Sequence, residues 1–114
     1  MILRILMTKV VPERLQDWLH YGRTIGFPGM LAQPGCRGIF RLRVHKAEFD
    51  FGVMTLWDDI ESFERFRTSP AMSELSAKAG GLTIRPYTEL LFDVMPDDSG
   101  NEADIAGALA KAPR

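Results

Sequence analysis

The sequence contains little of what marks several large classes of protein. It has a single cysteine, Cys36, so an internal disulfide is excluded and a reducing, cytoplasmic location is expected. No apolar run approaches the ~20 residues that a membrane helix needs. The N-terminal stretch is interrupted by Arg4 and Lys9, which argues against a signal peptide. The formal net charge is −1, which predicts neither a nucleic-acid-binding surface nor attraction to an anionic membrane.

Residues that carry familiar chemistry are also scarce. The chain has only two histidines, and neither has another ligand-type residue at metal-binding spacing. We expect His20 on the exposed side of a helix and His45 in a turn. There is no phosphate-binding loop, no Ser-His-Asp pattern, and no flavin or nicotinamide fingerprint. Cys36 has only Arg37 as a basic neighbour, so a nucleophilic role is not predicted. The sequence therefore predicts no metal and no cofactor.

What the chain does contain is a clear alternation of strand and helix patterns. Residues 2–9 are mostly apolar and predict a buried strand. A helix is expected to start near Pro12, since proline suits the first helical position. Its buried stripe has the spacing of one helix face and consists of Leu15, Trp18, Leu19 and Gly22. A loop is expected from Gly26 to Gly35.

Residues 36–44 and 49–57 predict a β-hairpin with a two- or four-residue turn around Lys46-Ala47. This register gives one continuous apolar face and a favourable charge pair on the other face. The expected pairs are Val44–Phe49, Leu42–Phe51, Phe40–Val53, Cys36–Trp57 and Arg43–Asp50, with Arg41 opposite Gly52. A three-residue turn would instead reverse the faces of one strand.

Two helical segments follow the hairpin. Asp58 is the expected N-cap, with Glu61 completing a capping box. Ser69-Pro70 predicts a second cap and a restarted helix, which Gly80-Gly81 ends. Residues 83–94 predict a last strand, and Pro86 places its start at an edge or a bulge.

The element order β-α-β-β-α-β predicts an α+β, ferredoxin-like domain with a four-stranded antiparallel sheet over residues 1–95. The first strand is apolar on both faces, because Leu3, Ile5 and Met7 alternate with Ile2 and Leu6. A second copy of the sheet is the simplest cover for the other face, so we expect a homodimer. Residues 96–114 are expected to form a polar linker and a short alanine-rich tail.

Two stretches, LAQPGCRGIFRLR and FGVMTLWDDIESFERFRTSPAM, carry a family resemblance. They resemble the antibiotic biosynthesis monooxygenase family of dimeric α/β barrels, in which a Pro-Gly precedes the second strand, a Trp ends the third, and a helix closes with Ser-Pro. The resemblance covers residues 1–94. It implies the dimeric barrel fold, and its members include cofactor-independent oxygenases of polyphenols and quinones as well as heme-degrading enzymes. Fold alone does not determine which activity applies.

Few of the family's functional residues carry over. The Asn, Trp and His of heme-degrading members fall on Leu3, Phe66 and about Ser76, which argues against heme degradation. The helix histidines of other members fall near Phe66 and Ala71. Polyketide-oxidising members use a Trp that matches Trp57, an Asn where this chain has Val53, and a hydroxylated aromatic where it has Phe63.

The candidate catalytic residues are Trp57, Arg41 and Tyr21. The candidate substrate-binding residues are Trp57, Phe63, Phe66, Arg41 and Tyr87. An aromatic side chain would stack on a planar substrate, and an arginine would hold a phenolate, carboxylate or enolate oxygen. Each has a structural alternative, since the aromatics suit a core and the arginines suit an exposed or interface stripe.

The sequence thus favours a dimeric small-molecule-binding protein that acts on an aromatic, quinol or polyketide-like compound as a cofactor-independent monooxygenase. In such an enzyme the deprotonated substrate itself supplies the electrons to O2. Two alternatives stay open: a ligand-binding or structural dimer without activity, and a cyclase or isomerase of the same fold.

Overall fold

The computed structural model describes residues 1–95, and the expected linker and tail at 96–114 lie outside the described residues. The strands are β1 (Ile2–Val10), β2 (Cys36–Arg43), β3 (Phe51–Trp57) and β4 (Thr83–Asp93). The helices are η1 (Pro12–Arg14), α1 (Leu15–Tyr21), η2 (Gly22–Gly26), α2 (Phe27–Leu31), α3 (Ile60–Arg67) and α4 (Pro70–Ala79). Within this part of the chain no helix is long and apolar enough to cross a membrane.

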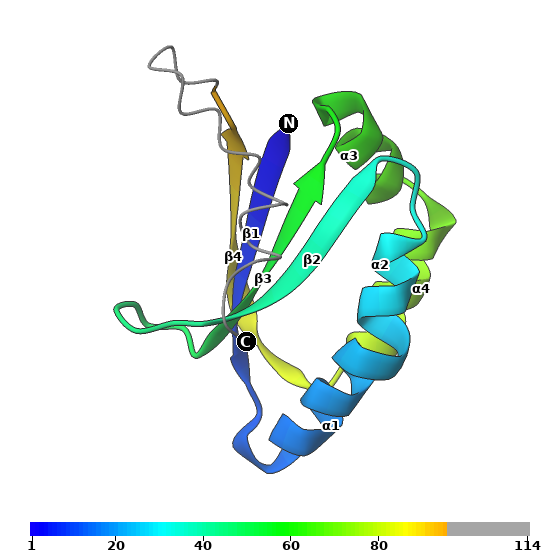
Figure 1. Cartoon of the computed structure of the whole chain (residues 1–114). Coiled ribbons are helices and arrows are strands. Elements are labelled where there is room, and N and C mark those ends of the chain that lie inside the picture. The colour runs from blue at the N-terminus through cyan, green and yellow to red at the C-terminus, as the bar shows by residue number, and fades with distance from the viewer. Residues whose placement is uncertain (96–114) are drawn as a thin grey trace.

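The four strands form one antiparallel sheet in the order β2-β3-β1-β4, and the helices pack together on one of its faces (Figure 1). This is the ferredoxin-like arrangement, so the predicted fold class is confirmed. β4 is an edge strand with a register shift between Met7 and Lys9 of β1, as Pro86 predicts.

The two faces of the sheet differ in character. Ile2 and Trp57 pair across β1 and β3 and pack under the helices, so Arg4, Leu6 and Thr8 also lie on the helix-facing side. The side chains between them face the other way. That second face is built from apolar residues of all four strands: Leu3, Ile5, Met7, Phe40, Leu42, Met54, Leu56, Leu90 and Phe92.

The expected hairpin register is wrong by one residue along most of its length. Phe40 pairs with Met54 and Arg41 pairs with Val53, because the Val44 amide donates to the Asp50 carbonyl across an odd-numbered, five-residue turn. An irregularity between Cys36 and Gly38 absorbs the shift, so the expected Cys36–Trp57 pair does form. β2 therefore presents its faces opposite to the prediction, and Arg41 lies on the helix-facing side.

The predicted Arg43–Asp50 charge pair does not form. In the observed register Arg43 lies opposite Phe51. The Asp50 carboxylate accepts a 3.4 Å hydrogen bond from the Val10 amide instead. The odd-numbered turn again explains the difference, since it displaces one strand by one residue relative to the other.

The helical region also departs from the prediction in two places. The segment expected to be a loop from Gly26 continues as helix, because η2 is a π-helical turn that leads directly into α2, with Pro28 in the first turn of α2. The N-cap of α3 is Asp59, not Asp58: its carboxylate accepts from the Ser62 amide at 2.8 Å. The predicted Ser69 cap and the stop at Gly80-Gly81 are confirmed.

Candidate functional site

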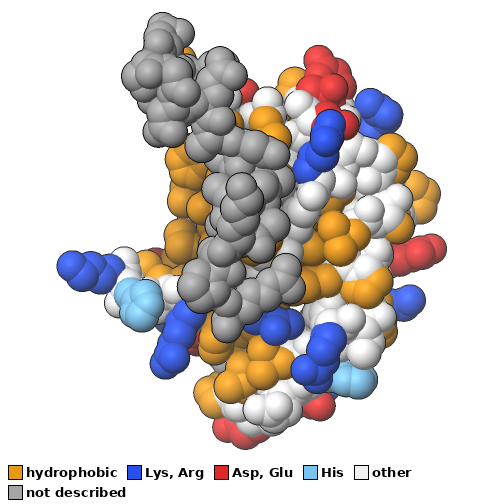
Figure 2. Space-filling view, viewed as in Figure 1, with side chains coloured by type: hydrophobic (Ala, Val, Ile, Leu, Met, Phe, Trp, Pro, Cys, Tyr) orange, Lys and Arg blue, Asp and Glu red, His pale blue; other side chains and the backbone are white. Residues whose placement is uncertain are grey.

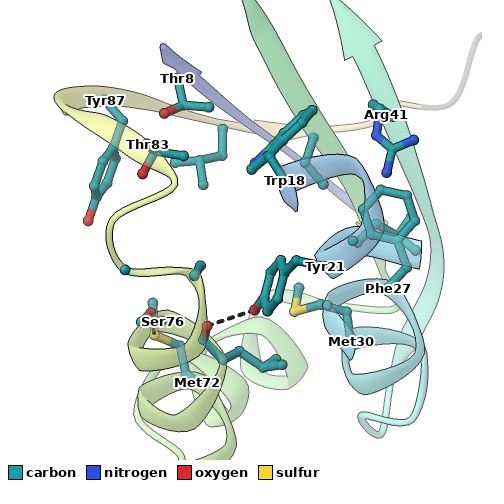
Figure 3. A pocket seen from close by; sticks show the side chains of 18 of the residues that line it. Thr8, Trp18, Tyr21, Phe27, Met30, Arg41, Met72, Ser76, Thr83 and Tyr87 are labelled. Carbon is teal, nitrogen blue, oxygen red and sulfur yellow. Dashed lines mark hydrogen bonds between the residues drawn. The ribbon is translucent and has the colours of Figure 1, made fainter. Parts of the chain in front are cut away.

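A cavity of about 360 Å³ lies between the helix-facing side of the sheet and the helical layer. Its floor comes from β1, β2 and β3, one wall from α1, η2 and α2, and the opposite wall from α4. Figure 3 shows Trp18 and Arg41 on one side of this space, Thr83 and Tyr87 on another, and Met72 and Ser76 below. Its lining is largely apolar and aromatic, which is typical of a small-molecule site.

Tyr21 bridges the two helical walls. Its hydroxyl donates a 2.7 Å hydrogen bond to the backbone carbonyl of Leu75 on α4, drawn as the dashed line in Figure 3. A Cβ at Gly26 would lie 3.0 Å from the Tyr21 ring, so the glycine leaves room for it. Burial raises the pKa of the Tyr21 phenol, which keeps it protonated at neutral pH and makes it a donor rather than a base.

Arg41 reaches the cavity from β2 and is held by neighbours that carry no negative charge. Its guanidinium carbon lies 5.4 Å from the Trp18 ring and 5.0 Å from the Phe27 ring, and its Nη2 donates to the Leu19 carbonyl at 3.2 Å. These contacts fix the group in a cation–π arrangement between two rings. Because Arg41 lies opposite Val53 rather than Gly52, it belongs to the helix-facing side of the sheet.

Trp57 and Phe63 do not line the cavity. Trp57 is 0% exposed and Phe63 is 2% exposed, and their rings meet edge to face at 5.8 Å. The Trp57 Nε1 donates to the Thr55 hydroxyl at 3.0 Å, so its one polar group is satisfied within the core. Phe66 stacks on Trp57 at 5.3 Å and also lines the cavity. Trp57 and Phe63 thus lie behind Phe66, which forms part of the cavity wall.

The β4 side of the cavity carries polar groups. Tyr87 lines it and is 49% exposed, with the Arg85 guanidinium carbon 5.9 Å from its ring. Arg4 rises from the floor and is paired with the Glu89 carboxylate at 2.7 Å. Arg4 also lies 5.5 Å over the Phe63 ring, which links the floor to the core behind it.

Of the expected site residues, the structure brings Arg41, Tyr21, Phe66 and Tyr87 to one cavity and leaves Trp57 and Phe63 outside its lining. Sequence reasoning assigned Trp18 to the helix core and overlooked Phe27. The buried stripe around Trp18 was visible, but only the hairpin register shows that Arg41 meets it. The one sequence signal for this contact is the presence of aromatic residues on a helix and an arginine on the strand that the helix covers, and it becomes informative only with the correct register.

The other titratable candidates lie elsewhere. His20 and His45 are exposed and do not line the cavity. Burial raises the pKa of the Cys36 thiol, which favours its unreactive protonated form. Among residues 1–95, no three His, Cys, Asp or Glu side chains come together as a metal site would require.

Comparison with known proteins identifies the family. The model of the antibiotic biosynthesis monooxygenase family matches residues 1–78, more than half of the chain. The protein therefore belongs to the antibiotic biosynthesis monooxygenase family, as its sequence resemblance implied. No curated protein matches the chain.

Solved structures show the same fold at low sequence identity. HapK from Hahella chejuensis is 10% identical with a TM-score of 0.73, and the match covers 85% of this chain and 95% of that one. Rv0793 from Mycobacterium tuberculosis is 17% identical with a TM-score of 0.64, covering 85% and 97%. A further structure, described as an antibiotic biosynthesis monooxygenase, is 18% identical with a TM-score of 0.68, covering 84% and 100%. These similarities concern the fold alone.

Proposed function

We propose that the protein binds a small aromatic, quinol or polyketide-like compound in the cavity between sheet and helices and oxidises it with O2 as a cofactor-independent monooxygenase. The observation that carries this proposal is the open cavity of about 360 Å³, lined by aromatic and apolar side chains with a few polar groups among them. A compound of two or three fused rings fits such a volume. Family membership supports the chemistry, although the fold alone would allow others.

The proposed reaction needs no electron donor other than its substrate. In an anthrone-type substrate, a ring CH2 made acidic by a neighbouring carbonyl loses a proton to water, and the resulting carbanion reacts with O2. Two C–H bonds break and one C=O bond forms, while the second oxygen atom leaves as water. Four electrons pass from the substrate carbon to O2, so the reaction is balanced. The protein binds the ring, favours its anion and limits access of water.

Four of the candidate residues have direct roles in this proposal. Phe66 and Tyr87 would contact the substrate rings, and Arg41 would hold an oxygen atom at the edge of the cavity. The Tyr21 hydroxyl would keep the two helical walls at their present separation. Trp57 and Phe63 would act indirectly, because they support Phe66 from behind.

We further propose that the working form is a homodimer joined through the sheet face that the helices leave uncovered. Exposed apolar side chains on that face include Leu90 and Phe92, which are 38% and 46% exposed. Figure 2 shows hydrophobic side chains along the β4 side of the molecule. The substitution Ile5→Glu introduces a charge at the middle of this face, so light scattering should show a monomer in place of the dimer. A wild-type protein that is monomeric at micromolar concentration would refute the dimer.

The alternatives differ in what they would show. A cyclase or isomerase of this fold would need a His-Tyr pair in the cleft, and neither histidine of the described chain lines the cavity. A binding protein without activity would bind the same ligands without consuming O2. The two outcomes separate in one experiment that follows binding and turnover together.

That experiment measures O2 uptake and absorbance with a panel of hydroquinones and anthrones. Ser73 and Ser76 are both exposed residues of α4, but only Ser76 lines the cavity. Ser76→Phe should therefore abolish binding and O2 uptake, while the matched Ser73→Phe should leave both unchanged. Binding without O2 uptake would remove the oxygenase and retain the ligand site. Equal loss or equal retention in the two variants would place the activity elsewhere.

A further inference from the structure

The charged side chains around the cavity are all of one sign. Arg4, Arg41 and Arg85 line it, and among the described residues no Asp or Glu does. Arg4 is neutralised by Glu89. Within residues 1–95, Arg41 and Arg85 form no ion pair with a carboxylate. Two arginines without counterions therefore flank an otherwise apolar space.

Arg41 is held in place although it has no counterion. Its two cation–π contacts and its bond to the Leu19 carbonyl fix the guanidinium at the cavity edge. Only one hydrogen bond from the protein is formed by this group, which has five N–H donors. The remaining donors are available to an acceptor in the cavity. A guanidinium fixed in this way loses little conformational entropy when it binds one.

The local chain is shaped around this guanidinium. A Cβ at Gly22 would lie 2.8 Å from the Arg41 Nη2, closer than real Cβ atoms approach, so only glycine leaves the present position free. Gly22 begins the π-helical turn η2, an irregularity that is frequent at functional sites. The side chain of Phe27, which follows η2, forms one of the two aromatic contacts.

The electrostatic surroundings of Arg41 are unfavourable to its charge in the free protein. Partial burial lowers its pKa, and the nearby positive charge of Arg23 lowers it further. Arginine remains charged at neutral pH in spite of this. A negative group in the cavity would relieve both effects and form charge-assisted hydrogen bonds with the unused donors.

We infer that the ligand of this cavity is a planar aromatic anion, a carboxylate or a phenolate, whose negative group binds Arg41 while its rings fill the apolar interior. This inference rests on the proposed function and specifies its substrate class. The rings would lie against Leu6, Val53 and Met30, which are apolar cavity residues. Arg85, on the opposite edge strand of the sheet, would add a second positive charge for ligands long enough to reach it.

The test compares two probes of the same shape and different charge. Anthraquinone-2-carboxylate and anthraquinone-2-carboxamide are titrated into the full chain by isothermal titration calorimetry. Each is measured with wild type, Arg41→Gln and Arg43→Gln. Arg43 lies two residues along the same strand, is exposed and does not line the cavity, so its substitution removes the same charge without touching the site.

We expect the carboxylate to bind wild type about tenfold more tightly than the carboxamide, as one charge-assisted contact at a partly exposed site predicts. Arg41→Gln should weaken carboxylate binding about tenfold and leave carboxamide binding unchanged, and Arg43→Gln should change neither. Equal binding of the two probes, or equal effects of the two substitutions, would overturn the anion inference while leaving the ligand-binding cavity intact. If neither probe binds at millimolar concentration, both the inference and the proposed ligand site are refuted.

Discussion

Two tryptophans in this protein sit among aromatic rings, and their surroundings differ in one respect. Trp57 is sealed: it is 0% exposed, contacts Phe63 and Phe66, and satisfies its N–H internally. Trp18 is 8% exposed and also lines the cavity, where it contacts Phe51 at 5.2 Å and the Arg41 guanidinium. Trp57 thus closes the core at one end of the sheet, which we call the sealed end. Trp18 borders an open, positively charged space at the other, which we call the open end.

The difference lies in what the neighbouring segments supply. Around Trp57, helices α3 and α4 supply Phe66 and Met72, which fill the space beside the ring and also form part of the cavity wall. Around Trp18 the helical layer contains two glycines, Gly22 and Gly26, and the wall they form accommodates Arg41 and the Tyr21 ring instead of bulky apolar groups. Dense packing at the sealed end stabilises the fold, whereas the space left at the open end can hold a small molecule.

The largest expected effect tests the sealed end. Trp57→Ala removes a fully buried ring and should lower the free energy of unfolding by about 3–5 kcal/mol, since the surrounding side chains cannot collapse to fill the space. Chemical denaturation of wild type and variant measures this. A loss below about 1 kcal/mol would show that Trp57 is not the centre of the core.

The matching change at the open end should separate stability from binding. Trp18→Ala should cost about 3 kcal/mol, the lower end of the range for buried aromatic side chains, because part of the ring faces the cavity. It should weaken the binding of anthraquinone-2-carboxylate about tenfold, since Arg41 loses one of its two aromatic contacts and the cavity loses part of the wall that the ligand would contact. If the loss of ligand affinity is in the same proportion to the loss of unfolding free energy in Trp18→Ala and in Trp57→Ala, the contrast between the two ends is wrong.

This contrast also explains what the sequence revealed and what it did not. The β-α-β-β-α-β order, the Ser69-Pro70 restart and the Gly80-Gly81 stop follow from local patterns, and all were predictable. The lining of the cavity depends on the hairpin register, and that register depends on whether the turn has an even or odd number of residues. Residues 45–49 contain no strong turn signal, so the sequence does not determine the length of the turn. A one-residue error in register assigns the side chains of β2 to the wrong faces, and the contact between Arg41 and Trp18 is then not predicted.

The family resemblance pointed to a different end of the molecule. It singled out Trp57 because that position is functional in polyketide-oxidising members, and the present chain buries it behind Phe66. Trp18 belongs to no motif and reads as one more residue of a buried helix stripe. Sequence could place it in the helix–sheet interface, but the space beside it depends on how Gly22, Gly26 and Arg41 pack together.

Gly22→Ala offers a finer test of the open end. The added Cβ should displace the Arg41 guanidinium, which is the flexible end of a long side chain, so the fold should tolerate the change. Gly22 has helical φ and ψ angles of −57° and −47°, and alanine is intrinsically more favourable there by about 1 kcal/mol. We expect stability to be unchanged or slightly higher, with binding of anthraquinone-2-carboxylate weakened about fivefold and that of the carboxamide unaffected. Equal weakening of both probes would mean that the Cβ blocks the cavity and does not act through Arg41.

The smallest effect concerns Tyr21, whose hydroxyl joins the two helical walls of the cavity. The chain has two tyrosines, so Tyr87→Phe leaves Tyr21 as the only one, and the additional Tyr21→Phe change provides the blank.

Burial raises the pKa of Tyr21 above its ordinary value of 10.0. In the unfolded chain the phenol ionises first, so the stability that Tyr21 contributes is complete below pH 10.0 and is lost as the pH rises through the folded pKa. The midpoint of the tyrosinate absorbance change in the folded Tyr87→Phe protein should therefore lie above pH 10.0, and stability should begin to fall near that pH. An ionisation midpoint at or below that pH in the folded protein would mean that water reaches the hydroxyl, and that its bond to the Leu75 carbonyl does not hold α1 and α4 together.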